Sequence, residues 1–268
     1  MKTRLITAAV GVPFLIFTLV VRGWFAEFVI VALTFIAMYE TYRALKKAGY
    51  AVCEWGGYVA TAAMWPLSRL MGVLDPLLLL VAAMGVSMTG VMLHEKPAFP
   101  DAAASVYPLL TCFLPMSMFM MMMNSTYGVV PGIALITMAF AIAYAGDGAA
   151  YFGGRSLGRH KLCPNVSPKK TVEGAIFGVL GGTLAGLACR AVFVYVFHMQ
   201  MPGIPATIAL GLIGSAAGEI GDLSASLLKR HSGIKDYGHI FPGHGGVMDR
   251  FDSVIFTLIV MYCYTLVL

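Results

Sequence analysis

The residues best suited to chemistry gather in one polar segment, residues 226–252, which reads SLLKRHSGIKDYGHIFPGHGGVMDRFD. The chain around this segment is 59% hydrophobic. The segment combines cations, carboxylates, a histidine and glycines: Lys229, Arg230, Lys235, Asp236, His244, Gly245, Gly246, Asp249 and Arg250. Such groups bind phosphates and divalent metal ions. The segment is therefore predicted to form a site for both.

Carboxylates lie on both sides of this segment. Glu219, Asp222 and Ser226 share one face of an expected apolar helix. Ionisable side chains inside a span are usually functional, although a hydrogen bond between helices is the alternative, above all for Glu219. Asp249 and Asp252 lie where the last helix should begin, and helix capping stays open for Asp252. Because Mg²⁺ needs one or two carboxylates plus phosphates and water, we predict that Asp222 and Asp249 bind one ion together.

A second polar segment, residues 147–174, begins at Asp147, which is either another acidic ligand or a partner for a sugar hydroxyl or a base. Its glycines and clustered basic residues predict an anion site, and contact with anionic lipid is the alternative. Ser167 and the proline after it predict a helix start. The first amides of that helix, with Lys169 and Lys170, would then face an anion.

His244 lies between two glycines and is a candidate general base. Transfer to a phosphate that is already ionised needs no base. We therefore predict that His244 binds phosphate or organises the loop instead of moving a proton.

Composition indicates a membrane protein. The mean hydropathy is +0.82 and 12% of residues are charged, against about 25% in soluble domains. A spanning helix needs about 20 apolar residues, which predicts an all-α, polytopic integral membrane protein with about nine transmembrane helices. The expected spans are 5–21, 24–42, 54–71, 76–93, 106–123, 129–147, 173–199, 204–228 and 252–268. The first is expected to be a retained helix; a signal peptide is the alternative.

The basic residues predict an orientation. With the amino terminus inside, fifteen of the eighteen Lys and Arg residues face the cytoplasm. Both polar segments are then cytoplasmic, where nucleotides are. The net charge of +5 fits loops near anionic lipid better than a nucleic-acid partner. Residues 1–128 are expected to hold N-terminal helices, and 129–268 the catalytic region of a single membrane domain.

The two polar segments resemble one family. Residues 226–252 resemble the signature S-x-apolar-K-R-x4-K-D-x-small-x2-apolar-P-x-H-G-G-apolar-x-D-R-apolar-D of the phosphatidate cytidylyltransferase, or CDP-diacylglycerol synthase, family. The run S-P-K-K-T-x-E-G from Ser167 resembles the same family, as does D-x-x-A-Y from Asp147. The resemblance is sharpest over residues 147–174 and 218–253.

This resemblance implies that CTP and phosphatidate give CDP-diacylglycerol and diphosphate at the inner membrane, with Mg²⁺ and room for a second cation. It implies CTP, phosphatidate and membrane lipids as partners and allows a homodimer. The catalytic residues it implies are Asp222, Lys229, Arg230, Lys235, Asp236, His244, Asp249 and Arg250. The substrate-binding residues it implies are Asp147, Ser167, Lys169, Lys170, Thr171, Glu173, Ser226, Gly245 and Gly246.

Other functions explain the sequence less well. A CDP-alcohol phosphotransferase needs two further aspartates after Asp147-Gly148, and they are missing. A CTP-dependent polyprenol or phytol kinase would not show the complete signature. A secondary transporter, the alternative that is not an enzyme, explains membrane charges but not two polar loops on one side.

Overall fold

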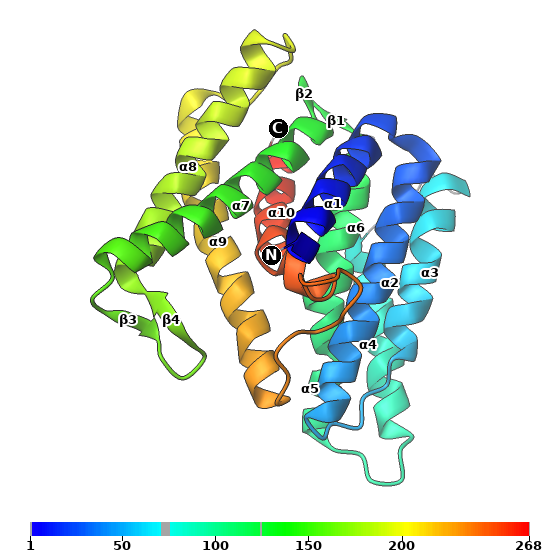
Figure 1. Cartoon of the computed structure of the whole chain (residues 1–268). Coiled ribbons are helices and arrows are strands. Elements are labelled where there is room, and N and C mark those ends of the chain that lie inside the picture. The colour runs from blue at the N-terminus through cyan, green and yellow to red at the C-terminus, as the bar shows by residue number, and fades with distance from the viewer. Residues whose placement is uncertain (1, 71–75, 124, 268) are drawn as a thin grey trace. The chain divides into compact units, whose positions relative to one another are not determined.

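The computed structural model describes residues 2–70, 76–123 and 125–267, and it is almost entirely helical (Figure 1). The helices are α1 (Lys2–Val21), α2 (Gly23–Lys47), α3 (Trp55–Leu70), α4 (Pro76–Met92), α5 (Phe99–Pro108), the π-helix η1 (Leu109–Phe113), α6 (Leu114–Met123), α7 (Gly132–Leu157), α8 (Val172–Tyr195), α9 (Ile204–His231) and α10 (Met248–Thr265). Two antiparallel strand pairs complete it: β1 (Thr126–Tyr127) with β2 (Val130–Pro131), and β3 (Lys161–Cys163) with β4 (Ser167–Thr171).

The predicted all-α class is confirmed. Among the residues that the structure describes, five helical segments are long and apolar enough to cross a membrane: Gly23–Lys47, Phe99–Met123, Gly132–Leu157, Val172–Tyr195 and Ile204–His231. Within the described residues, the other expected spans are also helical, but α3 and α4 are shorter. The count of nine spans stays a prediction. Residues 71 and 268, where two expected spans end, lie outside the described residues.

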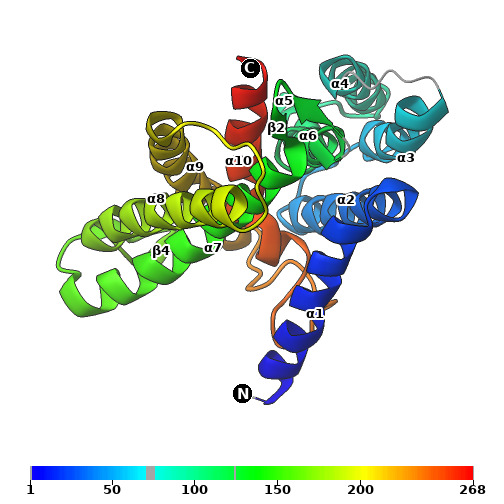
Figure 2. The same cartoon turned by 90° about the horizontal axis from the view of Figure 1, so that it is seen from above.

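Several helices extend further than hydropathy predicts. Helix α7 continues from the expected end at residue 147 to Leu157, and α9 continues from 228 to His231. The first part of the second polar segment is therefore helical instead of loop, and its Gly153 is buried in α7. A Cβ there would lie 2.5 Å from the Phe177 side chain of α8. This glycine lets two helices approach closely, and Figure 2 shows α7 and α8 side by side.

Contacts divide the chain into two compact units. The first unit contains Met1–Met121 and Leu228–Arg250, and the second contains Met122–Leu227 and Phe251–Leu268. The expected division into N-terminal helices (1–128) and a catalytic region (129–268) was drawn from the sequence and not from contacts. It stays a prediction. The polar segment is shared between the units, since its residues up to 227 and after 250 belong to the second.

The first unit has a core of large apolar side chains. Tyr42, Phe113, Met116 and Tyr237 are at most 1% exposed. Tyr42 donates a hydrogen bond to the Ser105 carbonyl at 3.2 Å. Tyr237 lies between α9 and α10 in sequence, so this core includes the connection between those helices.

The second unit packs its helices through small residues. Gly146 of α7 and Gly178 of α8 are buried, and a Cβ on Gly146 would lie 3.3 Å from the Gly178 carbonyl oxygen. Thr257 of α10 donates to the Gly214 carbonyl of α9 at 3.0 Å. Small residues and hydroxyl groups are typical of helix contacts in membranes.

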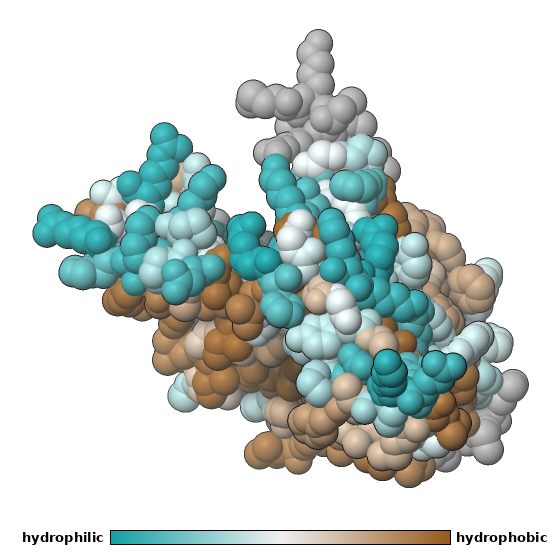
Figure 3. All heavy atoms as spheres, turned by 90° about the horizontal axis from the view of Figure 1, so that it is seen from below, coloured by the Kyte–Doolittle hydropathy of each residue, from teal (hydrophilic) through white to brown (hydrophobic). Residues whose placement is uncertain are grey.

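The predicted helix start at Ser167 is wrong. Residues 167–171 form β4, which pairs with β3, and α8 begins at Val172. The helix cap is Thr171, whose hydroxyl accepts a hydrogen bond from the Gly174 amide at 3.1 Å. The strand pairing uses the backbone groups that a helix from 168 would need. In Figure 3, hydrophilic atoms cover the hairpin end at the left, next to hydrophobic surface.

Candidate functional site

In the first unit, Asp249 organises the α9–α10 loop, residues 232–247. It lies in the first turn of α10 and is 8% exposed. Its Oδ2 accepts hydrogen bonds from the amides of Tyr237 at 2.7 Å and Gly246 at 3.0 Å. Its Oδ1 accepts from Lys229 Nζ at 3.0 Å. We call these four residues the loop site. Three donors satisfy most of what one buried carboxylate can accept.

Lys229 supplies the positive charge of the loop site. It lies in the last turn of α9, with its side chain 15% exposed, and its Nζ is 5.4 Å from the centre of the Tyr237 ring. A cation over an aromatic face adds to the ion pair with Asp249. The sequence predicted both charged residues, and the structure brings them together.

The loop itself turns at its glycines. Gly243 and Gly245 have φ angles of +77° and +87°, which residues other than glycine rarely adopt. The Phe241 amide donates to the Gly245 carbonyl at 2.9 Å, and the His244 amide donates to the Phe241 carbonyl at 2.8 Å. The Nδ1 atom of His244 is buried and has no hydrogen-bond partner among the described residues. His244 thus has an unused polar atom inside a tight turn.

The sequence analysis missed two residues of α2 that touch this loop. Glu40 is 2% exposed, and its carboxylate accepts from the amides of Val247 at 3.2 Å and Met248 at 2.9 Å. Arg43 donates a hydrogen bond to the Tyr237 carbonyl. The signal in the sequence that could have found Glu40 is an acidic residue within an apolar helix.

In the second unit, the partners that Asp222 has among the described residues are side chains. Its Oδ2 lies 2.8 Å from Lys170 Nζ, and its Oδ1 accepts from the Ser226 hydroxyl at 3.4 Å. Both members of the ion pair are partly exposed, at 21% and 28%. Three predicted site residues from β4 and α9 therefore meet here. Each Asp222 oxygen has one of these partners and keeps capacity for another ligand.

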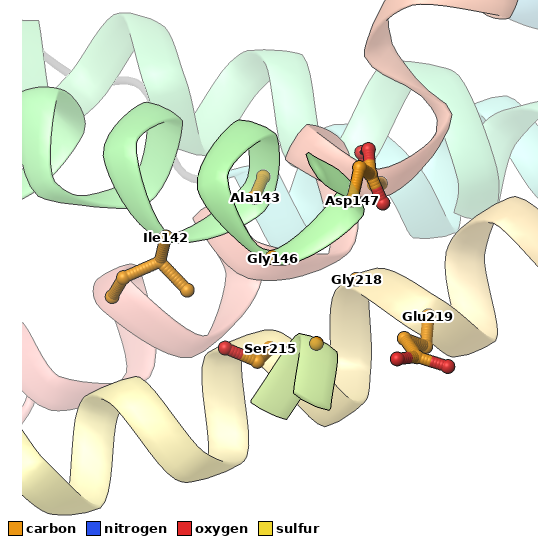
Figure 4. A pocket seen from close by; sticks show the side chains of 9 residues that line it. Ile142, Ala143, Gly146, Asp147, Ser215, Gly218 and Glu219 are labelled. Carbon is orange, nitrogen blue, oxygen red and sulfur yellow. The ribbon is translucent and has the colours of Figure 1, made fainter. Parts of the chain in front are cut away.

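A small hollow lies beside Glu219, one turn before Asp222 on α9. In Figure 4, Ile142 and Asp147 lie along α7, and Ser215 and Glu219 lie along α9; all four line the hollow. Asp147 Oδ2 accepts from the Ser253 hydroxyl at 2.9 Å. Within the described part of the chain, Ser215 Oγ and Glu219 Oε1 are buried without a hydrogen-bond partner.

We call these groups the helix site: Asp147, Lys170, Ser215, Glu219, Asp222, Ser226 and Ser253. All of them belong to the second unit. Oxygen atoms dominate the set, and carboxylate and hydroxyl oxygens are ligands that Mg²⁺ accepts. Among the described residues, no group of three or more His, Cys, Asp and Glu side chains is arranged to hold a metal ion. The predicted magnesium ligands Asp222 and Asp249 belong to different units.

The remaining predicted residues of the second unit shape the hairpin. Glu173 accepts hydrogen bonds from the amides of Arg159 at 3.0 Å and His160 at 3.2 Å, and it lies 2.6 Å from His160 Nδ1. This carboxylate therefore anchors the chain before β3. Ser167 begins β4, and Lys169 is exposed on it.

Exposed charges surround the loop site. Arg230, Lys235, Asp236 and Arg250 are all exposed and accessible to a ligand. Asp252 is buried at 9%, and its Oδ1 accepts from the Ser253 amide at 2.9 Å. That contact lies inside the helix, since α10 begins at Met248.

The fold and these polar groups define a helical membrane protein with basic and acidic groups suited to phosphate chemistry. The family model of the cytidylyltransferase family matches residues 2–268. The chain therefore belongs to the cytidylyltransferase family. The predicted family resemblance is confirmed.

Several relatives are named phosphatidate cytidylyltransferase. The chain is 42% identical over 131 residues to the one from Bacillus subtilis (strain 168), covering 49% of this chain and 47% of the relative. It is 41% identical over 138 residues to that of Synechocystis sp. (strain ATCC 27184 / PCC 6803 / Kazusa), covering 51% and 45%. It is 44% identical over 127 residues to that of Staphylococcus epidermidis (strain ATCC 35984 / DSM 28319 / BCRC 17069 / CCUG 31568 / BM 3577 / RP62A), covering 47% of each. The chain spans about half the length of the curated relatives it matches.

Proposed function

We propose that this protein is a phosphatidate cytidylyltransferase, which converts CTP and phosphatidate into CDP-diacylglycerol and diphosphate. Membership of the cytidylyltransferase family, together with 41–44% identity to relatives of that name, carries this proposal. The basic groups around the loop site and on the hairpin support it, because both substrates are polyanions.

The reaction needs charge neutralisation and alignment more than proton transfer. A phosphate oxygen of phosphatidate attacks the α-phosphorus of CTP, the bond to the β-phosphate oxygen breaks, and diphosphate leaves. Positioning and electrostatic stabilisation dominate such transfers. Lys229 and Arg230 at the end of α9, Lys235 in the loop and Arg250 at the start of α10 would offset phosphate charge, and Lys170 would do so from the hairpin.

His244 has a supporting role in this proposal. The attacking phosphate is already ionised, so no general base is needed. The tight turn at His244 and its buried Nδ1 suit a residue that organises the loop or contacts a phosphate.

Magnesium is the cofactor that we propose. Asp222 fits a ligand role, because each of its oxygens has capacity beyond its contacts with Lys170 and Ser226. Asp249 has less capacity, because it already accepts three hydrogen bonds. The proposal that both bind one ion rests on their sequence positions before and after the polar loop. Bound magnesium would withdraw charge from the phosphates.

We further propose that the protein lies in the bacterial plasma membrane with its amino terminus and both sites facing the cytoplasm. The distribution of Lys and Arg supports this orientation. A reporter fused after residue 268 should behave as extracytoplasmic. A cytoplasmic reporter would overturn the nine-span topology.

Labelled CTP tests the proposed reaction. Label from the α-phosphate should enter the lipid fraction only with phosphatidate and a divalent ion, and one diphosphate should be released per lipid formed. Transfer of the γ-phosphate with release of CDP would instead establish a lipid kinase. If folded protein put neither the α-label nor the γ-label into lipid, both enzyme activities would be contradicted and transport would be favoured.

A further inference from the structure

Glu40 is an unusual residue for its position in the fold. It lies on α2, an apolar helix of the first unit, and only 2% of it is exposed. A buried carboxylate is unfavourable unless hydrogen bonds compensate for its lost hydration. Glu40 accepts compensating hydrogen bonds from the amides of Val247 and Met248, 207 and 208 residues further along the chain.

We infer that Glu40, assisted by Arg43, is a positioning residue that holds the α9–α10 loop in the conformation required for cytidylyl transfer. This inference rests on the proposed function. It assigns a role in the reaction to α2, which lies outside both polar segments of the sequence.

The two α2 side chains hold the loop near both of its ends. Val247 and Met248 immediately precede Asp249, so the Glu40 carboxylate fixes the entry into α10 and adds a negative charge at its N-terminus. At the other end, the Tyr237 carbonyl accepts from Arg43 while the Tyr237 amide donates to Asp249. Residues 238–246, including His244, lie between these two anchors.

The glycines of the loop give independent support. A Cβ on Gly238 or Gly246 would collide with the Glu40 carboxylate. Both positions therefore need glycine because the carboxylate fills the space where a side chain would be. The Gly246 amide also donates to Asp249 at 3.0 Å, so the same residue links Glu40 to the loop site.

This geometry predicts which kinetic constant will change. Glu40 is 2% exposed, and its carboxylate is taken up by backbone amides of the loop end. Loosening the loop should disturb groups that must be aligned in the transition state, which lowers kcat more than it raises KM. A residue that serves folding alone would change the amount of folded protein and leave kcat per folded molecule unchanged.

The test compares Glu40→Gln and Glu40→Ala with Glu54→Gln as a matched control. Glu54 makes an ion pair with Lys46 in the same unit. Gln keeps one acceptor oxygen and Ala keeps none, so kcat per folded molecule should fall about 10-fold for Gln and further for Ala. The KM for CTP should change by less than about 3-fold, and Glu54→Gln should match wild type. Arg43→Ala, with exposed Lys47→Ala as its control, should give a smaller loss.

Hydrogen exchange at the Val247 and Met248 amides separates this inference from the proposed function. Exchange should accelerate about 10-fold or more in Glu40→Gln while helix α7 keeps its wild-type protection. Unchanged exchange, or unchanged kcat in folded Glu40 variants of an active enzyme, would overturn the inference. If wild-type protein transfers no cytidylyl group, the proposed function fails, and exchange alone decides whether Glu40 holds the loop.

Discussion

The loop site and the helix site use carboxylates differently. In the loop site, Asp249 is 8% exposed and accepts from two backbone amides and one ammonium group. In the helix site, Asp222 is partly exposed, and its hydrogen-bond and ion-pair partners among the described residues are the side chains of Lys170 and Ser226. Backbone donors fix a loop, whereas side-chain partners can move when a ligand arrives.

This difference predicts different roles for the two aspartates: Asp249 supports the fold as well as the site, whereas Asp222 serves ligand binding. Loss of Asp249 leaves buried donors without an acceptor, which destabilises the fold as well as the site. Loss of Asp222 removes ligand capacity while the surrounding backbone keeps its hydrogen bonds. Sequence alone treats both aspartates as equivalent metal ligands.

The largest effect is expected for Asp222→Asn. Turnover should fall at least about 100-fold, because a carboxylate ligand of the proposed magnesium ion is removed. The unfolding midpoint should stay at the wild-type value. Label transfer from CTP over a magnesium titration measures the loss, with exposed Glu95→Gln as the control. Near-normal activity at limiting magnesium would exclude Asp222 as a ligand.

Lys229→Ala should reduce both activity and stability. The change leaves the Asp249 carboxylate, in a side chain only 3% exposed, without its ammonium partner, and breaking a buried pair costs several kcal/mol. The control is Lys46→Ala, which breaks the ion pair between Lys46 and Glu54. The Lys46 side chain is 55% exposed, so this change should cost less than about 1 kcal/mol. Equal unfolding midpoints for the two variants would show that the buried ion pair stabilises the fold no more than the exposed one.

Lys170→Ala should have an intermediate effect on activity and little effect on stability. The ion pair with Asp222 is partly exposed, so its contribution to folding is small. A lost phosphate contact worth about 1.4 kcal/mol would slow turnover about 10-fold. Exposed Lys96→Ala is the control in the same assay. A normal rate for Lys170→Ala would leave the hairpin without a catalytic role.

Ser215→Ala should have the smallest effect. Within the described part of the chain its hydroxyl is buried without a hydrogen-bond partner. Removing it should leave the unfolding midpoint unchanged and change the rate by less than about 2-fold. Ser105 provides the contrast, since it accepts from the Cys53 amide at 2.9 Å and donates to the Asp101 carbonyl at 2.7 Å. Ser105→Ala should lower the midpoint. A large activity loss in Ser215→Ala would show that the hollow binds a needed ligand.

The sequence predicted the helices well. Long apolar runs need burial or lipid, and a helix lets their backbone N–H and C=O groups hydrogen-bond within the segment. The sequence predicted the β3–β4 region poorly. Ser167-Pro168 matched a helix start, but pairing with residues 161–163 and the Thr171 cap determine the structure. Such pairing depends on partners that hydropathy does not describe.

The sequence identified charged residues of the site but not their pairing. Lys229 and Asp249 were both predicted as site residues, and the structure pairs them. Glu40 was missed, because its donors lie more than 200 residues away and no local motif marks that contact. A carboxylate in an apolar helix predicts a partner but does not name it.

The most direct test of the contrast between the two sites is a parallel measurement of Asp222→Asn and Asp249→Asn. Unfolding midpoint and turnover per folded molecule would be determined for each purified variant. Both variants should lose turnover, but only Asp249→Asn should unfold at a lower temperature than wild type. Equal midpoints for the two variants, or a lowered midpoint for Asp222→Asn alone, would contradict this account.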